Sequence, residues 1–282
     1  MAQLPEYVQL NGTKTSLIID CSARTPAICY WGKRLSEASH RSMLQRLATR
    51  QEVKCSVVVE APISLSPLNG EGFTGAPGIE ISNKQCAWSL GGELVEVAQN
   101  DPQSVTFTCL DNDRNIRFSH TFYLDKLTNV VTASTQLTNL TDADLHLHWC
   151  AAPTIPVPDN VNKIMSFEGR WSNEFLRNEV DLFLGSFLRE NRKGKTSHDN
   201  FPGVIVHHGT AHEHHGHCYG FHLGWSGNHR TRVEHLPEGR NYVQMGELLL
   251  PDEVILGTNQ SYQSPNMYFS YSANGFSELS QN

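Results

Sequence analysis

The segment CYGFHLGW, residues 218–225, alternates large apolar side chains with small or polar ones. Successive side chains of a β-strand point to opposite faces, so this period of two predicts a half-buried strand. The residues predicted to share its apolar face are Tyr219, Phe221, Leu223 and Trp225. Ser226-Gly227-Asn228 then forms a turn, and a returning strand begins near Val233. Taken alone, the region is typical of a β-hairpin.

The same alternation recurs along the chain. It is clear in SVTFTCL, residues 104–110, and in residues 145–150, where Leu147 and Trp149 are predicted to face away from His146 and His148. Further strands are predicted at residues 54–60, 116–123, 129–139 and 267–272. Many short strands between turn signals predict an all-β fold, a β-sandwich with at most one or two short helices. We expect residues 1–282 to form a single domain.

Two segments favour helix by pattern. Residues 36–51 are rich in helix formers, which predicts a short helix there. In Glu174 to Glu190, apolar residues recur every four positions, which is typical of a helical stripe. These residues are Leu176, Val180, Leu184 and Leu188.

Composition excludes some classes of function. The formal net charge of -7 argues against a nucleic-acid binder, which needs a basic surface. No apolar run approaches the length of a membrane-spanning helix, and the first ten residues do not have the pattern of a signal peptide. The seven cysteines are odd in number and none are spaced as a metal-binding pair. We therefore expect reduced thiols in a cytoplasmic protein, and no cofactor.

A histidine-rich segment, HHGTAHEHHGH, covers residues 207–217. Imidazoles are suitable zinc or nickel ligands, and His212, His214 and His217 are the candidates. The spacing matches no helical zinc motif, and two glycines indicate a loop. We predict a solvated hairpin loop that binds metal only adventitiously, and no dedicated metal site.

Two further motifs suggest contact with a ligand. In GRWSNEF, residues 169–175, an exposed Trp171 beside Arg170 would suit a sugar, with the indole on the apolar pyranose face and the guanidinium on hydroxyl groups. The alternative is a tryptophan of the core with a surface arginine. In SHDNF, residues 197–201, Ser197, His198 and Asp199 are sequence neighbours, so they cannot converge as a hydrolytic triad, and a locally hydrogen-bonded loop is predicted instead.

The order of these motifs resembles a known family. GRWSNEF, then the loop RKGKTSHDNF, then CYGFHLGWSGNHRTRVE are similar to the amino-terminal domain of glycoside hydrolase family 36, whose members are chiefly α-galactosidases. Residues 30–35 and 65–81 fit upstream, and residues 246–247, 262–265 and 271–280 fit downstream, so nearly the whole chain is covered. The resemblance implies a galactose-mutarotase-like β-supersandwich. It also implies extended strands, with a turn near Gly185, in place of the helix suggested for Glu174 to Glu190.

The chain departs from the family pattern in several places. Phe73, Thr74 and Gly75 stand where the family usually has an acidic and a basic residue. Asn200-Phe201-Pro202 replaces an asparagine-proline-phenylalanine order, and Ser264-Pro265-Asn266 replaces threonine-proline-glutamate. The histidine-rich loop is extra. These differences bear on sugar preference and on the subfamily.

The resemblance implies a non-catalytic domain. In family 36 a catalytic (β/α)₈ barrel follows the sandwich and carries both catalytic aspartates, so the barrel is expected after residue 282 and this chain alone is predicted to be inactive. We therefore predict no catalytic residue in this chain. Its carboxylates, such as Glu168, Glu174 and Asp199, are not expected to act as nucleophile or acid/base. The resemblance further implies a homo-oligomer in which one sandwich approaches the barrel of another subunit. Its substrate-binding candidates are Arg170, Trp171, Ser197, His198 and Asn200, with the loop 69–73 as a weaker one.

Three functions follow from these observations. The first is the amino-terminal domain of a retaining α-galactosidase, which packs on the barrel and helps to shape the substrate pocket and the oligomer. The second is a stand-alone carbohydrate-binding β-sandwich, and the third is a metal-binding protein that uses the histidine-rich loop. Neither nucleic acid nor a membrane is expected as a partner.

Overall fold

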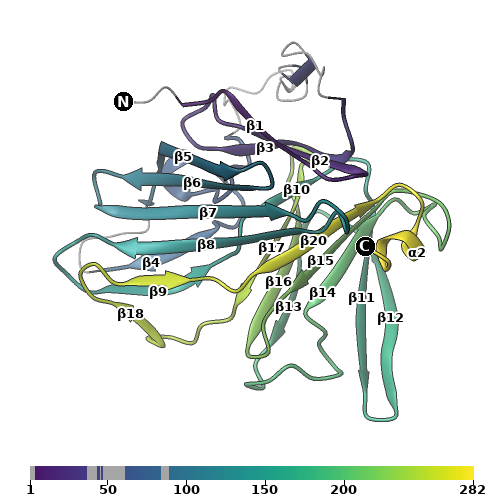
Figure 1. Ribbon diagram of the computed structural model, residues 1–282. Coiled ribbons are helices and arrows are strands. Elements are labelled where there is room, and N and C mark those ends of the chain that lie inside the picture. The colour runs from purple at the N-terminus through teal and green to yellow at the C-terminus, as the bar shows by residue number, and fades with distance from the viewer. Residues whose placement is uncertain (1–3, 37–42, 45, 47–60, 84–88) are drawn as a thin grey trace.

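The computed structural model describes residues 4–36, 43–44, 46, 61–83 and 89–282, and in this part nearly all regular structure is antiparallel β-sheet (Figure 1). A first, three-stranded sheet has the order β1-β2-β3. Its strands are β1 (Tyr7–Asn11), β2 (Thr15–Asp20) and β3 (Ala27–Lys33). The predicted helix at residues 36–51 falls largely on residues outside the described ranges, and the predicted strand at 54–60 lies wholly outside them.

The largest sheet has ten strands, nine of which follow the order β12-β11-β14-β15-β20-β8-β7-β6-β5, while β19 pairs with β8. In chain order these strands are β5 (Glu93–Asp101), β6 (Ser104–Asp111), β7 (Ile116–Leu124), β8 (Val131–Asn139), β11 (Lys163–Arg170), β12 (Asn173–Asp181), β14 (Gly203–His207), β15 (Cys218–Leu223), β19 (Ser261–Gln263) and β20 (Met267–Ser272). The alternation that predicted strands at 104–110, 116–123, 129–139 and 267–272 is confirmed by β6, β7, β8 and β20.

Two smaller sheets complete the architecture. The four-stranded sheet β10-β17-β16-β13 contains β10 (Ile155–Val157), β13 (Gly185–Asn191), β16 (His229–His235) and β17 (Asn241–Glu247). The three-stranded sheet β18-β9-β4 contains β4 (Ile79–Ser82), β9 (Leu145–Cys150) and β18 (Val254–Leu256). Besides the described residues 43, 44 and 46, which are helical, the short helical elements are η1 (Asn69–Glu71) and α2 (Phe276–Leu279). None of the helices in the described part is long and apolar enough to cross a membrane.

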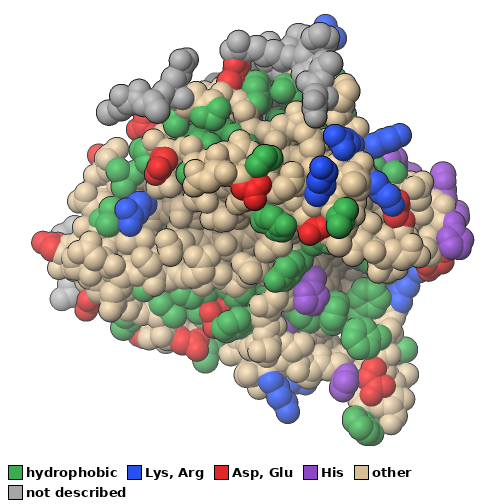
Figure 2. Space-filling view, viewed as in Figure 1, with side chains coloured by type: hydrophobic (Ala, Val, Ile, Leu, Met, Phe, Trp, Pro, Cys, Tyr) green, Lys and Arg blue, Asp and Glu red, His purple; other side chains and the backbone are tan. Residues whose placement is uncertain are grey.

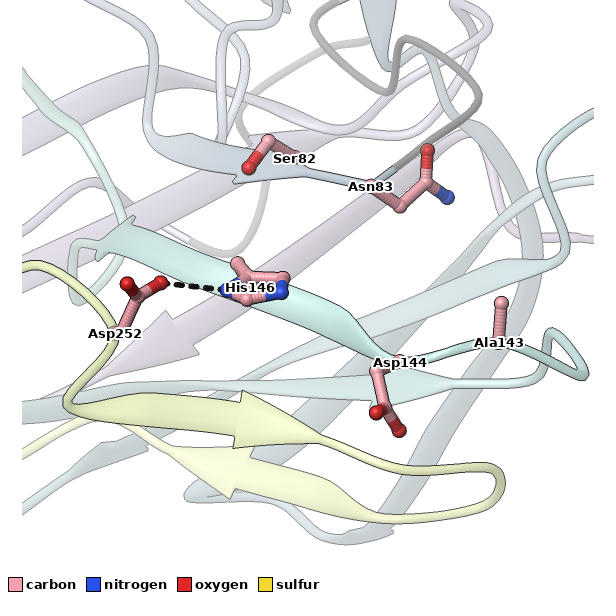
Figure 3. A pocket seen from close by; sticks show the side chains of 6 residues that line it. All are labelled: Ser82, Asn83, Ala143, Asp144, His146 and Asp252. Atoms are coloured by element: carbon pink, nitrogen blue, oxygen red, sulfur yellow. Dashed lines mark hydrogen bonds and ion pairs between the residues drawn. The ribbon is translucent and has the colours of Figure 1, made fainter.

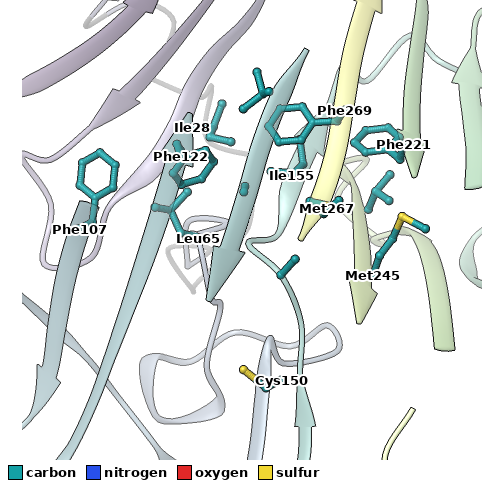
Figure 4. Close-up of a cluster of buried hydrophobic side chains, with 14 of the residues drawn as sticks. Ile28, Leu65, Phe107, Phe122, Cys150, Ile155, Phe221, Met245, Met267 and Phe269 are labelled. Carbon is teal, nitrogen blue, oxygen red and sulfur yellow. The ribbon is translucent and has the colours of Figure 1, made fainter. Parts of the chain in front are cut away.

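The apolar core lies between these sheets (Figure 4). It joins Phe107 and Phe122 of the ten-stranded sheet to Met245 of the four-stranded sheet, as the all-β sandwich prediction requires. Trp31 of β3 closes one end, because its ring meets Phe269 edge to face with 4.8 Å between centroids and Tyr219 with 5.2 Å. Burial of aromatic side chains on this scale is the main favourable term for such a fold.

The structure corrects the hairpin predicted from residues 218–246. β15 belongs to the ten-stranded sheet and β16 to the four-stranded sheet, so the two strands do not pair with each other. The intervening turn leads the chain from one sheet to the other. A hydrogen bond of 2.8 Å from the Gly224 N–H to the Asn266 carbonyl holds this turn. β15 ends at Leu223, and Trp225 is 38% exposed instead of sharing the buried face of Tyr219 and Phe221.

The segment Glu174 to Glu190 is extended, as the family resemblance implied, and the helical pattern was wrong. It forms most of β12 and β13, and Gly185, the first residue of β13, has φ 109°. A spacing of four residues suits a helix, but it also keeps side chains on one face of a strand, because four is a multiple of two. Leu176 and Val180 accordingly lie on the same face of β12, opposite Glu168 and Ile164 of β11.

The loop at residues 69–73 carries a buried carboxyl group. Burial raises the pKa of Glu71 to about 7, although a hydrogen bond from the Gly92 N–H and the charge of Arg24 oppose the shift. The Oε1 atom of Glu71 is buried without a hydrogen-bond partner in the described part. Ionisation of this group therefore opposes folding.

We expect Glu71→Gln to stabilise the fold more at pH 8 than at pH 5. The folded-state pKa lies above the unfolded one, so the wild-type carboxyl loses stability as pH rises from the unfolded pKa through about 7, and glutamine removes this loss. Thermal unfolding of both proteins from pH 5 to pH 8 measures the difference in melting temperature. A difference that stays constant with pH would contradict the assignment.

Candidate functional site

The hairpin β11–β12 projects from the body of the molecule, and its turn carries Arg170 and Trp171 (Figure 1). Trp171 is 82% exposed. Of the two alternatives that the sequence allowed, a surface tryptophan and a core tryptophan, the structure therefore shows the first. The turn geometry explains this: Ser172 has φ 64°, and Gly169 has φ 150° at a register shift in the strand pairing. A Cβ at Gly169 would collide with the Asn173 carbonyl oxygen, so only glycine fits there. The tip thus presents an indole and a guanidinium to the outside.

The loop of residues 197–201 is held by its own side chains. The Ser197 hydroxyl donates to the Asp199 carboxylate, and Lys193 forms an ion pair with the same group. The hydrogen bonds from Lys193 and Ser197 lower the pKa of Asp199 to about 2. His198 is exposed and Asp199 accepts directly from Ser197, so the order serine, histidine, aspartate needed for a triad does not form. The predicted locally bonded loop is confirmed.

An aromatic cluster joins this loop to the half of the hairpin nearer its turn. The Phe201 ring lies 5.3 Å from that of Phe175 and 5.9 Å from that of Phe167. On its other side Phe201 lies 5.1 Å from the ring of His222 in β15, and burial lowers the pKa of His222. The five substrate-binding candidates therefore fall into two groups, Arg170 and Trp171 at the tip, and Ser197, His198 and Asn200 in the loop beside the hairpin.

Arg189 of β13 fixes the relative position of these two parts. Its guanidinium donates to the Asp199 carbonyl at 2.9 Å and to the Phe167 carbonyl at 3.4 Å. Burial lowers the pKa of Arg189, while the charges of Glu168 and Asp199 oppose the shift. Sequence reasoning missed Arg189, because a lone arginine in a strand carries no signal of the carbonyl groups that it will meet.

The weaker candidate loop, residues 69–73, turns inward. Phe73 is buried and its ring lies 5.8 Å from that of Tyr242, within a small core cluster. Tyr242 in turn donates to the Glu234 carboxylate and lies 2.9 Å from the Ala76 N–H. The described contacts of Phe73 are those of a packing residue.

The histidine-rich segment forms the connection between β14 and β15 at the edge of the molecule near α2 (Figure 2). His212, His214 and His217 are exposed, and the His217 ring stacks on Tyr271, with its Nδ1 2.6 Å from the hydroxyl. In the described residues no three histidine, cysteine, aspartate or glutamate side chains gather as ligands for a metal ion. His207 differs from the rest: it is 1% exposed within β14, and its Nε2 lies 3.4 Å from Glu179.

A separate pocket lies at the edge of the sheet β18-β9-β4 (Figure 3). The residues that line it are Ser82, Asn83, Ala143, Asp144, His146 and Asp252. The His146 Nδ1 lies 2.7 Å from the Asp252 carboxylate, and the neighbouring His148 Nε2 lies 2.6 Å from the Ser82 hydroxyl. None of the predicted substrate-binding residues is among these described lining residues, and none of the six is a tryptophan, tyrosine or phenylalanine.

Comparison with known proteins decides the family. Residues 24–257 match the model of the glycosyl hydrolase family 36 N-terminal domain. The chain belongs to this family. An α-galactosidase of Escherichia coli is 30% identical over 278 residues, which is 99% of this chain and 38% of that protein. The α-galactosidase AgaA of Geobacillus stearothermophilus is 28% identical over 153 residues, which is 54% of this chain and 21% of that protein.

Solved structures of relatives have the same fold as this family 36 domain. A crystal structure of AgaA A355E from Geobacillus stearothermophilus in complex with 1-deoxygalactonojirimycin aligns with a TM-score of 0.85 and 21% identity, over 97% of this chain and 42% of that one. The galactosidase domain of the α-galactosidase-sucrose kinase AgaSK aligns with a TM-score of 0.84 and 19% identity, over 98% of this chain and 42% of that one. The chain therefore spans about two fifths of the length of these relatives.

We expect Arg189→Met to loosen the loop 197–201 of the family 36 domain. Loss of two hydrogen bonds from a charged donor leaves carbonyl oxygens unpaired and should cost about 1–3 kcal/mol of unfolding free energy. Hydrogen exchange should become faster in this loop and at Phe167, and chemical denaturation measures the stability. Arg192→Met is the matched control, because Arg192 is exposed and pairs with Glu190. Equal effects of the two variants would contradict the role of Arg189.

Proposed function

We propose that this chain is the non-catalytic amino-terminal domain of a retaining α-galactosidase. The observation that carries the proposal is membership of the glycosyl hydrolase family 36 N-terminal domain, together with 30% identity to a curated α-galactosidase along 99% of the chain. Related AgaA variants from Geobacillus stearothermophilus were crystallised in complex with raffinose and with stachyose. The proposed substrates are accordingly terminal α-galactosides.

The chemistry of retention supports a non-catalytic role. A retaining glycosidase needs two carboxyl groups about 5 Å apart, one as nucleophile and one as acid/base. The carboxylates near the candidate site are engaged otherwise: Asp199 pairs with Lys193, and Glu174 accepts from the Ser172 N–H at 2.9 Å. The catalytic pair belongs, in this proposal, to a (β/α)₈ barrel elsewhere in the full-length protein.

The domain would contribute to substrate binding through Arg170 and Trp171. An indole that is 82% exposed on a projecting turn has its apolar face free for a pyranose ring, and the neighbouring guanidinium can donate to hydroxyl groups. Ser197, His198 and Asn200 would line the approach beside the hairpin. A tip of this kind would complete a substrate pocket on the barrel of its own or a neighbouring subunit of a homo-oligomer.

We also propose a cytoplasmic location. The five described cysteines, Cys21, Cys29, Cys109, Cys150 and Cys218, are free thiols. Burial raises the pKa of Cys21 and of Cys150 to about 12, so these thiols are kept unreactive. Reduced, buried thiols are usual in the cytoplasm.

The family role is tested by assaying the chain beside a product of the natural gene extended beyond residue 282. Only the extended protein is expected to release the aryl group from an aryl α-galactoside, because only it would hold the carboxylate pair. A folded extended protein without α-galactosidase activity would refute the proposed activity. Activity of the 282-residue chain alone would refute the non-catalytic role.

In the active extended protein, Trp171→Ala is expected to raise KM for an α-galactoside about tenfold, because the stacking contact is worth about 1 kcal/mol or more. Trp171→Phe should recover part of the loss, since a smaller aromatic face remains. Tyr123→Ala is the control, because Tyr123 is a 43% exposed aromatic residue on β7, away from the hairpin. An unchanged KM in Trp171→Ala would contradict the role of the tip.

A further inference from the structure

Residues 212–215 of the histidine-rich segment form a tight turn between β14 and β15. The His212 N–H donates to the His215 carbonyl at 2.9 Å, and the two residues form an isolated antiparallel bridge. Directly opposed residues of an antiparallel pair carry their side chains on the same face. The turn therefore brings two imidazoles together on one side, with Glu213 and His214 as the connection between them.

The two imidazole rings lie at a separation that suits a shared metal ion. Their centroids are 5.5 Å apart, and both side chains are exposed. A Zn–N bond of about 2.0–2.1 Å places each ring centroid roughly 3.2 Å from the metal, so two rings at the tetrahedral angle would have centroids about 5.3 Å apart. The observed spacing is close to this value. Small rotations of the exposed side chains can direct one nitrogen of each ring at a common point.

Both rings have a nitrogen available for a ligand. The His215 ring has no hydrogen bond to any residue that the structure describes, and the His212 Nδ1 has one long contact, 3.4 Å from the His214 N–H. Neutral imidazole is a ligand of zinc, nickel and copper. His217 is engaged elsewhere, because its Nδ1 lies 2.6 Å from the Tyr271 hydroxyl. The paired residues thus differ from the candidates predicted from the sequence, which included His214 and His217 but not His215.

The same turn holds the segment that begins α2. The Phe276 N–H donates to the His212 carbonyl at 3.1 Å. The Ser277 N–H donates to the Glu213 carbonyl at 2.9 Å, and the Ser277 hydroxyl donates to the Glu213 carboxylate at 3.2 Å. A Cβ at Gly275 would collide with the His212 carbonyl oxygen, so the two segments are in close contact. An ion that fixes the turn would therefore also fix the start of α2.

We propose that His212 and His215 chelate one divalent transition-metal ion such as Zn²⁺, and that the bound ion clasps the turn against α2. In the part of the chain that the structure describes, no three potential side-chain ligands gather at one point, so water molecules would complete the coordination. The site serves as a metal-responsive clasp and not as a catalytic centre. The proposal needs nothing of the proposed α-galactosidase activity.

Calorimetric titration tests the chelate. The 282-residue chain, purified without a polyhistidine tag and treated with EDTA, is titrated with Zn²⁺ at about pH 7.5, where free imidazoles are mostly neutral. We expect one ion per chain. His212→Gln and His215→Gln should each weaken binding by more than the roughly tenfold that loss of an outer-shell partner costs.

His214→Gln is the matched control for this titration. His214 is exposed on the same turn, between the two paired residues, and its ring is not part of the ring pair. Zn²⁺ affinity should therefore stay unchanged in this variant. A wild-type chain that binds no Zn²⁺, or an equal loss in His214→Gln, would overturn the chelate. Undiminished binding in both variants of the pair would mean an adventitious ion only and would overturn it as well.

Hydrogen exchange tests the clasp. The Phe276 and Ser277 amides donate to carbonyls of the turn, so Zn²⁺ should slow their exchange in the wild-type chain and have no such effect in His215→Gln. The Gln260 amide is the internal control, because it donates to the Gly257 carbonyl in the turn before β19. Zinc binding that leaves the exchange of Phe276 and Ser277 unchanged, or that slows it equally in His215→Gln, would overturn the clasp.

Discussion

The apolar layer between the sheets is the constraint on which the rest of the structure depends. Each strand of that layer must keep one row of side chains inward, and a slip of one residue would turn the whole row to solvent. Trp31 shows how tightly the layer is closed, because its ring meets three aromatic rings of β15 and β20 edge to face. The positions of β15 and β20 follow from this layer, and β14, β11 and β12 follow outward from them by pairing.

Local alternation predicted individual strands well, but it could not predict their partners. β9 begins at Leu145 and ends at Cys150, as the alternation indicated, since its side chains are truly buried on one face. β15 and β16 were expected to pair because they are close in sequence, yet their apolar faces are buried from opposite sides of the core. The choice between hairpin and sheet crossing depends on contacts far away in sequence, which no local pattern contains.

The candidate site shows the same limit. The residue types around Trp171 indicated a surface suited to a sugar, and the turn geometry at Gly169 and Ser172 explains its exposure. The contacts that hold the hairpin and the loop 197–201 together could not be predicted from the sequence. Arg189, Phe201 and His222 come from three separate segments, and their contacts exist only after β11, β13 and β15 have been positioned. The roles of Ser197, His198 and Asn200 in binding remain predictions.

The projecting hairpin combines two demands that usually conflict. A tip that contacts a ligand must stand clear of the body, whereas a long, exposed edge strand invites nonspecific pairing. Charged residues along β12 reconcile them, because Arg177 and Glu179 make pairing with an apolar strand unfavourable. Lys163 and Asp181 add a cross-strand ion pair at 2.6 Å at the open end of the hairpin, where β11 also pairs with β14. The charges along this edge therefore allow the tip to stand clear of the body while they oppose nonspecific pairing of the strand.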